Sequence, residues 1–276
     1  FQPQVDFLIM DLALNDQLTL RTGTPVTGLM NFRGFSDGPA VQGNPLIGNS
    51  PADMITAGTG VKLVGSFDSF GFDVTVNRGF GEDLTSVTGG NTGLNFIGKF
   101  RYTGSDVFKF GAGAATSTGS KSLVFASGDG ENYNLSSGAS SARNTHAAIP
   151  GETIVHADGK ITGGGADVDL WTGYGTASQN DVTSSAFFGG AGLKFDLSDN
   201  FYLAGRFTFV SDQSDNLPDG ASTSLTRIQG GLGVEVYDKA LFKIEAVQQS
   251  HGDTAVTRPA PADSFFGLLT ELSFNF

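Results

Sequence analysis

The side chains that could carry out acid–base or nucleophilic chemistry are few. The chain has three histidines and no cysteine, which excludes thiol catalysis, thiolate metal sites and disulfides. A histidine can activate a neighbouring serine when a carboxylate orients it, and Ser250-His251-Gly252-Asp253 is the one local run with these residue types. His146, His156 and His251 fall in expected loops or near strand ends, where an ordinary solvated histidine is the simpler interpretation. We therefore expect no enzyme activity.

Motifs that bind metals, phosphates or nucleic acids are equally weak. The acidic run from Asp212 to Gly220 faintly resembles a calcium loop but lacks the EF-hand spacing. The glycine runs at 163–165 and 189–190 have no following helix, so we interpret them as strand glycines and not as phosphate loops. A formal net charge of −12 without a basic stripe argues against nucleic acid. We expect no metal, no cofactor and no nucleic-acid partner.

The composition is unlike that of a soluble domain with a charged surface. There are 40 glycines and 24 phenylalanines, and charged residues make up 16% of the chain, against about 25% in an average soluble domain. The longest apolar piece near the start is Phe7-Leu8-Ile9-Met10, too short for a transmembrane helix. If the chain crosses a membrane, it must therefore do so as a closed barrel. The start lacks the pattern of a secretory signal, so we expect Phe1 to be a mature N-terminus.

From residue 58 onward the chain falls into segments of about ten residues in which apolar and polar side chains alternate. In the clearest hairpin, residues 186–197 and 200–211 flank the turn Ser198-Asp199-Asn200. Phe207 and Phe209 share one face of the second arm, and Arg206 lies on the other. A soluble β-sandwich shows the same alternation, so this pattern alone leaves both architectures open.

The lengths of the connections favour a barrel. Short turns alternate with long polar stretches rich in Gly, Ser, Asn and Asp, as in outer-membrane barrels with short turns on one side and long loops on the other. We predict an all-β fold, a transmembrane antiparallel up-and-down β-barrel in one domain over residues 1–276. The expected twelve strands lie in residues 4–21, 58–69, 70–81, 92–103, 105–116, 120–158, 164–176, 184–197, 200–211, 222–237, 239–250 and 264–276. Fourteen strands is the alternative, because two regions are open: residues 5–14 and 17–24 could form a hairpin around Asn15-Asp16, and residues 117–158 look like a loop. Either region could add two strands.

The last thirteen residues, SFFGLLTELSFNF, carry a more specific pattern. This segment resembles the C-terminal β-signal of Gram-negative outer-membrane barrels, in which a final Phe and alternating apolar residues are read by the barrel-assembly machinery. In a soluble protein, an exposed terminal strand as apolar as this one would promote aggregation. The resemblance implies location in the cell outer membrane, with lipid and lipopolysaccharide around the barrel. The residues that match the signal are Phe266, Leu268, Leu272, Phe274 and Phe276.

Alternation places a set of charged side chains on the inward face of the predicted barrel, where they would line the pore. Basic and acidic residues are nearly balanced in this set, so most of the net negative charge falls on turns, loops and ends. Asp73 is expected on the same face. The candidate pore-lining residues are Lys62, Asp68, Lys99, Arg101, Lys109, Asp169, Lys194, Asp196, Arg206, Arg227, Glu235, Lys243, Glu245 and Glu271.

A twelve-strand barrel lies between barrels that side chains fill and barrels that hold a wide aqueous channel. We therefore predict a narrow, porin-like pore for passive diffusion of small hydrophilic solutes or ions, with a homo-oligomer left open. One alternative is a structural or adhesive barrel with an occluded lumen, in which loops 22–59 or 117–158 fold inward. A channel for hydrophobic compounds is another, with the apolar residues 7–10 acting inside the barrel instead of as a strand.

Overall fold

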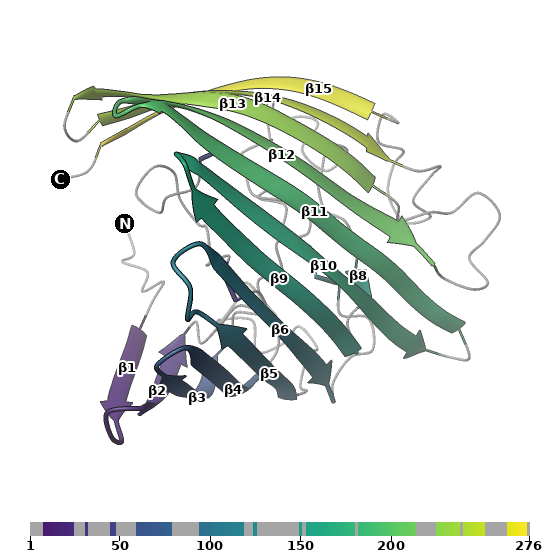
Figure 1. Cartoon of the computed structure of the whole chain (residues 1–276). Helices are drawn as coiled ribbons and strands as arrows, with labels where there is room; N and C mark the ends of the chain where they lie inside the picture. The colour runs from purple at the N-terminus through teal and green to yellow at the C-terminus, as the bar shows by residue number, and fades with distance from the viewer. Residues whose placement is uncertain are drawn as a thin grey trace, which may run out of the picture.

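The fold is a single curved antiparallel sheet whose strands follow one another in chain order (Figure 1). The computed structural model describes residues 8–24, 31–32, 45–47, 59–78, 94–118, 124–125, 149–150, 153–179, 182–213, 225–237, 240–251 and 264–274. The 13 strands of the sheet are β1 (Leu8–Ala13), β2 (Leu18–Thr24), β3 (Thr59–Phe67), β4 (Phe70–Arg78), β5 (Leu94–Tyr102), β6 (Phe108–Ser117), β9 (Thr153–Gly163), β10 (Ala166–Gln179), β11 (Val182–Ser198), β12 (Phe201–Asp212), β13 (Leu225–Tyr237), β14 (Ala240–His251) and β15 (Ser264–Phe274). A separate small pair joins β7 (Val124–Phe125) to β8 (Ile149–Pro150).

The predicted all-β, up-and-down fold is confirmed. Most strands lie within a few residues of their predicted bounds, because period-2 alternation marks both arms of each hairpin. The described sheet has 13 strands instead of twelve. The additional strand comes from the N-terminal hairpin that the sequence left open, in which the Asn15 side chain accepts hydrogen bonds from the backbone N–H groups of Gln17 and Leu18. None of the described residues forms a helix long and apolar enough to cross a membrane.

The two ends of the sheet differ in how they connect strands. Short links join β1 to β2, β3 to β4, β5 to β6, β9 to β10, β11 to β12 and β13 to β14, all at one end, which we call the turn end (left in Figure 1). Gly164 and Gly165 form one of these turns with φ values of 61° and 79°, a conformation that glycine adopts without strain. They are therefore turn residues, not the strand glycines that the sequence suggested. At the other end the links between consecutive strands are long, except for the two residues 180–181 that join β10 to β11.

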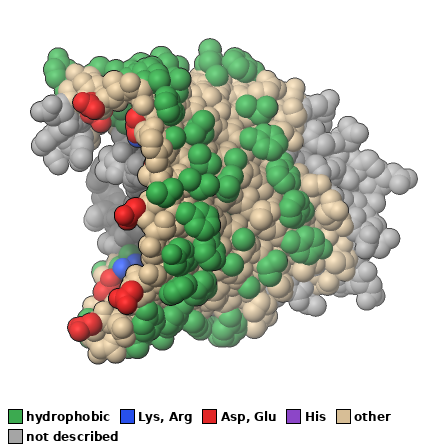
Figure 2. Space-filling view, in the orientation of Figure 1, with side chains coloured by type: hydrophobic (Ala, Val, Ile, Leu, Met, Phe, Trp, Pro, Cys, Tyr) green, Lys and Arg blue, Asp and Glu red, His purple; other side chains and the backbone are tan. Residues whose placement is uncertain are grey.

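The outer face of the sheet is apolar. Leu203 and Phe207 are exposed on it, while Arg206 of the same strand is buried on the opposite, inward face. Figure 2 shows hydrophobic side chains spread over the outer face, with charged side chains visible at the turn end. Phenylalanine and tyrosine rings of β4 to β6 contact one another near that end, for example Phe70 and Tyr102 with ring centroids 5.2 Å apart. Such aromatic bands mark the membrane interfaces of outer-membrane barrels.

The sheet has two edges in the described part of the chain, formed by β1 and β15. Both strands run toward the turn end, since an odd number of alternating strands brings the first and last into the same direction. The outward side chains of β15 include Phe266, Leu268 and Leu272, all exposed. They have the alternation predicted for the C-terminal segment, in which Phe274 is the last described residue and Phe276 lies outside the described residues.

Candidate functional site: the charged interior of the barrel

Charged side chains gather on the inward face of the sheet. Along the strands many of them are buried, as for Arg206, Arg227 and Lys243. Toward the turn end they become exposed, as for Asp196 and Glu235. By strand register, Lys62, Lys99, Arg101, Lys109, Asp169, Lys194, Glu245 and Glu271 lie on this same face. Asp68 differs from the prediction, because it lies in the exposed turn between β3 and β4 with a φ of 32°.

Three basic side chains from β3 and β5 surround one carboxylate on β4. The Arg101 Nη1–Asp73 Oδ1 distance is 2.7 Å, and the ammonium groups of Lys62 and Lys99 lie 3.2 and 3.4 Å from Asp73 Oδ2. All four side chains are largely buried. We call Lys62, Lys99 and Arg101 with Asp73 the basic cluster. One acid among three bases leaves this group of residues with an excess of positive charge.

The wall formed by β13 to β15 is more evenly balanced. Lys243 Nζ lies 3.5 Å from Glu271 Oε1 on the neighbouring strand. Arg227 Nε donates a 2.6 Å hydrogen bond to Gln249 Oε1, and both residues are fully buried. Buried charges that lack such partners are costly. The pairing therefore explains how these strands tolerate charge on a covered face.

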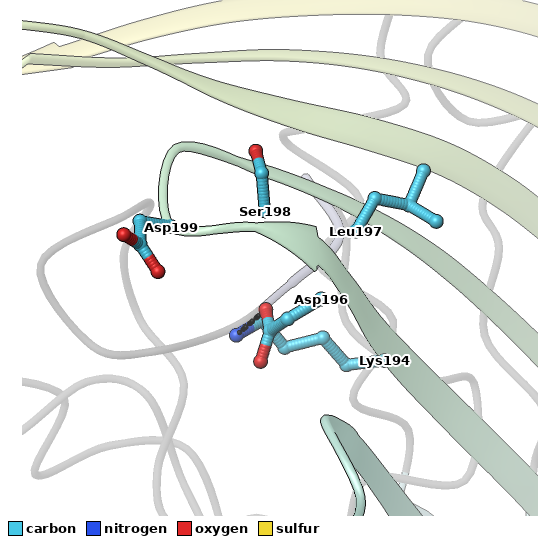
Figure 3. A pocket seen from close by; sticks show the side chains of 5 residues that line it. All are labelled: Lys194, Asp196, Leu197, Ser198 and Asp199. Atoms are coloured by element: carbon cyan, nitrogen blue, oxygen red, sulfur yellow. Dashed lines mark ion pairs between the residues drawn. The ribbon is translucent and has the colours of Figure 1, made fainter.

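A second group of polar side chains lies near the turn end of β11 and β12. Figure 3 shows Lys194 and Asp196 side by side on one side of the strand, joined by an ion pair with an Nζ–Oδ1 distance of 2.7 Å. Together with Leu197, Ser198 and Asp199 they line an open depression of about 380 Å³. The Lys194 ammonium also lies 5.0 Å from the centre of the Tyr202 ring. Lys194 and Asp196 lie on the inward face and belong to the turn-end mouth of the interior.

Part of the β2–β3 connection contacts the inward face of β9. The Asp158 Oδ2 atom accepts hydrogen bonds of 2.8 Å from the backbone N–H groups of Asn31 and Phe32. Its Oδ1 atom accepts a 2.9 Å bond from the Asn31 side-chain amide. The His156 ring is buried next to this carboxylate, with Nε2 3.5 Å from Asp158 Oδ1. We call this contact the first anchor.

Another part of the same connection contacts the opposite wall. The backbone N–H of Ile47 donates a 2.6 Å hydrogen bond to Glu245 Oε2, and the Tyr202 hydroxyl donates a 3.0 Å bond to the Pro45 carbonyl oxygen. Leu46 and Ile47 are 2% and 8% exposed, and Ile47 packs against Val247 and Leu269. We call this contact the second anchor. Since β9 and β14 are separated by four strands in the sheet, the two anchors fix the connection to different walls of the interior.

Glycines on the inward face make room for both anchors. A Cβ atom at Gly111 would collide with the Asn31 side-chain amide. A Cβ atom at Gly231 would lie 3.1 Å from Leu46 Cδ2 and 2.7 Å from the Ile244 carbonyl oxygen. These positions need a residue without a side chain because the inward connection approaches the backbone of the wall closely.

Sequence reasoning missed the residues of the first anchor. His156 was expected in a loop or near a strand end, but it lies within β9 and points inward, so that expectation is corrected. The strand itself was expected only somewhere in residues 120–158, and the structure places it at Thr153–Gly163. The sequence His156-Ala157-Asp158-Gly159-Lys160 alternates polar and small residues, which was the available signal. No group of three or more His, Asp or Glu side chains in the described ranges is arranged to hold a metal ion.

Comparisons with known proteins place this arrangement among membrane barrels. No protein-family model and no curated protein sequence matches the chain. Among solved structures, outer-membrane expressed OmpT of Vibrio cholerae matches with a TM-score of 0.59 and 15% identity, over 98% of this chain and 81% of OmpT. A trimer form of the same Vibrio cholerae protein, folded in vitro, matches with a TM-score of 0.53 and 14% identity, over 96% and 88% of the two chains. A porin matches with a TM-score of 0.52 and 10% identity, over 94% and 77% of the two chains.

At these identities the likeness concerns the fold. Three features of the chain itself agree with this likeness: the up-and-down sheet in chain order, the apolar outer face and the charged inward face. The outer membrane, predicted from the C-terminal segment, is also where the OmpT neighbour is found. By its fold, the chain is an outer-membrane β-barrel protein.

Proposed function

We propose that the protein is a narrow, porin-like channel for passive diffusion of small hydrophilic solutes or ions. The observation that carries this proposal is the set of charged side chains on the inward face, from Lys62 on β3 to Glu271 on β15. Charged side chains are costly away from water, and a barrel that only anchored loops would have no need of them along so many strands. The porin among the structural neighbours supports the same class of function.

The two anchors narrow the interior in this proposal. They fix residues of the β2–β3 connection to β9 on one side and to β12 through β15 on the other. A solute would pass beside this connection and along the basic cluster. The channel would therefore admit only small solutes, and the positive charge of the cluster would favour anions at that wall, where the sequence predicted a balance of charges.

A structural or adhesive barrel with an occluded lumen is the second candidate. The anchors support it as well, since Leu46 and Ile47 fill part of the interior with apolar side chains. The hydrophobic-compound channel has less support. It required residues 7–10 to act inside the barrel, but Leu8, Ile9 and Met10 belong to β1 and pair with β2.

Conductance in planar lipid bilayers distinguishes the two remaining candidates. The channel proposal expects discrete, small current steps from the purified, folded protein, and slow entry of small sugars into protein-containing liposomes. Protein unfolded by heat before addition is the control. Folded protein that gives neither current nor solute entry would overturn the channel and leave the occluded barrel.

The fold also suggests which partners the protein contacts, and we give these partners as proposals. We propose contact of the outer face with lipid and lipopolysaccharide, and recognition of the C-terminal segment by the barrel-assembly machinery. A homo-oligomer is compatible with the trimer form of the OmpT neighbour. We propose no catalytic activity and no cofactor.

A further inference from the structure

The two anchors of the β2–β3 connection differ in the kind of interaction that holds them. The first anchor consists of hydrogen bonds to one carboxylate, Asp158. The second anchor combines a hydrogen bond to Glu245 with the Ile47 side chain packed against Val247 and Leu269. Apolar burial resists exposure to water, whereas water can replace hydrogen bonds. The two anchors should therefore differ in how easily they open.

The first anchor is also incompletely satisfied. Asn31 Oδ1 and both ring nitrogens of His156 are buried without a hydrogen-bond partner among the described residues. The His156 Nε2–Asp158 Oδ1 distance of 3.5 Å is too long for a good hydrogen bond. Buried polar atoms without partners raise the free energy of the closed contact. Opening this anchor would let water bond to Asn31 Oδ1, and among the described contacts it is the Asp158 bonds that favour the closed state.

The second anchor has the opposite character. Leu46 is 2% exposed and lies against the backbone at Gly231. Glu245 is held in place by a 2.9 Å hydrogen bond from Gln229 Nε2, so the carboxylate is oriented even without the connection. Tyr202 adds a hydrogen bond to Pro45. Opening either anchor leaves a buried carboxylate with fewer partners, but opening the second anchor would in addition expose the almost fully buried Leu46 and Ile47 side chains.

We propose that the first anchor is the releasable one and the second anchor is permanent, so that Asp158 is the positioning residue that sets the width of the channel. This inference rests on the proposed channel function. In it, Asp158 holds Asn31 and Phe32 next to β6 and β9, beside the wall that carries the basic cluster. Release of this contact widens the passage at that wall, while Leu46 and Ile47 stay in place.

Single cysteines can report each anchor separately, because the chain has no cysteine of its own. Phe32→Cys keeps the three hydrogen bonds to Asp158, since the one from residue 32 comes from its backbone. Leu46→Cys reports the second anchor. Each is combined with Asp158→Asn, and the rate of modification by a water-soluble thiol reagent is measured in lipid vesicles. Asp167→Asn is the matched control, since Asp167 lies on the neighbouring strand, pairs with Lys160 at 3.1 Å and takes part in neither anchor.

Asp158→Asn is expected to speed modification at position 32 by about tenfold or more, which corresponds to the loss of one hydrogen bond to a charged group. Modification at position 46 should not change, and Asp167→Asn should change neither rate. Single-channel conductance of Asp158→Asn should rise above that of the unmodified protein. Equal rates at position 32 with and without Asp158→Asn would overturn the inference, as would release of both positions together. In a protein that does conduct, faster modification without a rise in conductance would overturn it as well.

The failure of the channel proposal would look different. In that case neither the unmodified protein nor Asp158→Asn would conduct, yet the difference between positions 32 and 46 would remain and would support unequal anchors in an occluded barrel. If Asp158→Asn fails to assemble, Asp158→Glu serves as the second variant. Its carboxylate is displaced by one methylene, so it should speed modification at position 32 by less than Asp158→Asn, and an unchanged rate would count against the inference.

Discussion

Arg101 Nη1 lies 2.7 Å from Asp73 Oδ1 across the β4–β5 pair, and this ion pair is the centre of the basic cluster. Lys62 and Lys99 approach the other oxygen of the same carboxylate. One acidic side chain therefore offsets the mutual repulsion of three basic ones. The cluster therefore depends on Asp73 more than on any one of its three basic side chains.

Asp73→Asn should destabilise the folded barrel, because it leaves three buried basic groups without their carboxylate. Removal of one partner from a buried ion pair costs about 3–5 kcal/mol. The free energy of unfolding in lipid vesicles, measured by urea titration, tests this. Asp167→Asn, which breaks a pair that is one-third exposed, should cost about 1 kcal/mol or less. Equal costs for the two variants would contradict the role assigned to Asp73.

The direction of side chains on β12 gives a second prediction. Phe207 is exposed on the outer face near the middle of the strand, and Arg206 is buried on the inward face. Phe207→Arg places a charge in lipid and should cost about 2–4 kcal/mol, whereas Arg206→Lys, which keeps a positive charge on the inward face, should be mild for folding. Leu197→Arg, near the turn end, should cost about 1 kcal/mol or less because it lies close to the interface. Equal and small effects of all three changes in vesicles would count against the proposed orientation in the membrane.

Ion selectivity should respond to interior and loop charges in different ways. Arg206→Gln combined with Arg227→Gln should shift the reversal potential toward cations at all salt concentrations, because buried charges are screened little. Neutral replacements of Asp215 and Asp219, which lie outside the described residues, should reduce any cation preference only at low salt, since the Debye length is about 10 Å at 0.1 M. A reversal potential that responds to salt in the same way for both sets would show that the two arginines do not act inside the channel.

The last residue of the chain gives a prediction about assembly. Deletion of Phe276, or its replacement by a charged residue, should lower the amount of protein in the outer membrane, since the C-terminal segment resembles the assembly signal. The stability of barrels that do assemble should change little. Quantitative detection in outer-membrane fractions, followed by unfolding of the assembled material, separates the two effects. Normal outer-membrane levels would remove the main support for that resemblance.

The face on which a side chain lies could be predicted from sequence, because strand alternation needs only local information. The placement of Phe207 outward and Arg206 inward is an example. The anchors could not be predicted in this way. Asn31 and Asp158 are 127 residues apart, and Ile47 and Glu245 are 198 apart. Alternation shows that Glu245 points inward but carries no information about which connection meets it there.

The distribution of charge within the interior could not be predicted from the sequence either. Counted together, the inward acids and bases nearly cancel, which predicted a balanced lumen. The structure shows that Lys62, Lys99 and Arg101 share one carboxylate on neighbouring strands. A total over all strands hides this local excess, because it does not record which charges lie next to one another.

The direction of the two edge strands has a consequence for how the wall can be sealed. A closed barrel in which every neighbouring pair of strands is antiparallel needs an even number of strands. The described sheet has 13. A seam that joined β1 directly to β15 would therefore be parallel, with evenly spaced and slanted hydrogen bonds unlike those elsewhere in the sheet. An antiparallel seam needs one further strand that runs from the turn end to the opposite end of the sheet. Lipid offers no hydrogen bonds to the backbone of an open edge. Closure of the barrel therefore depends on the hydrogen bonds formed at the seam between the β1 and β15 edges.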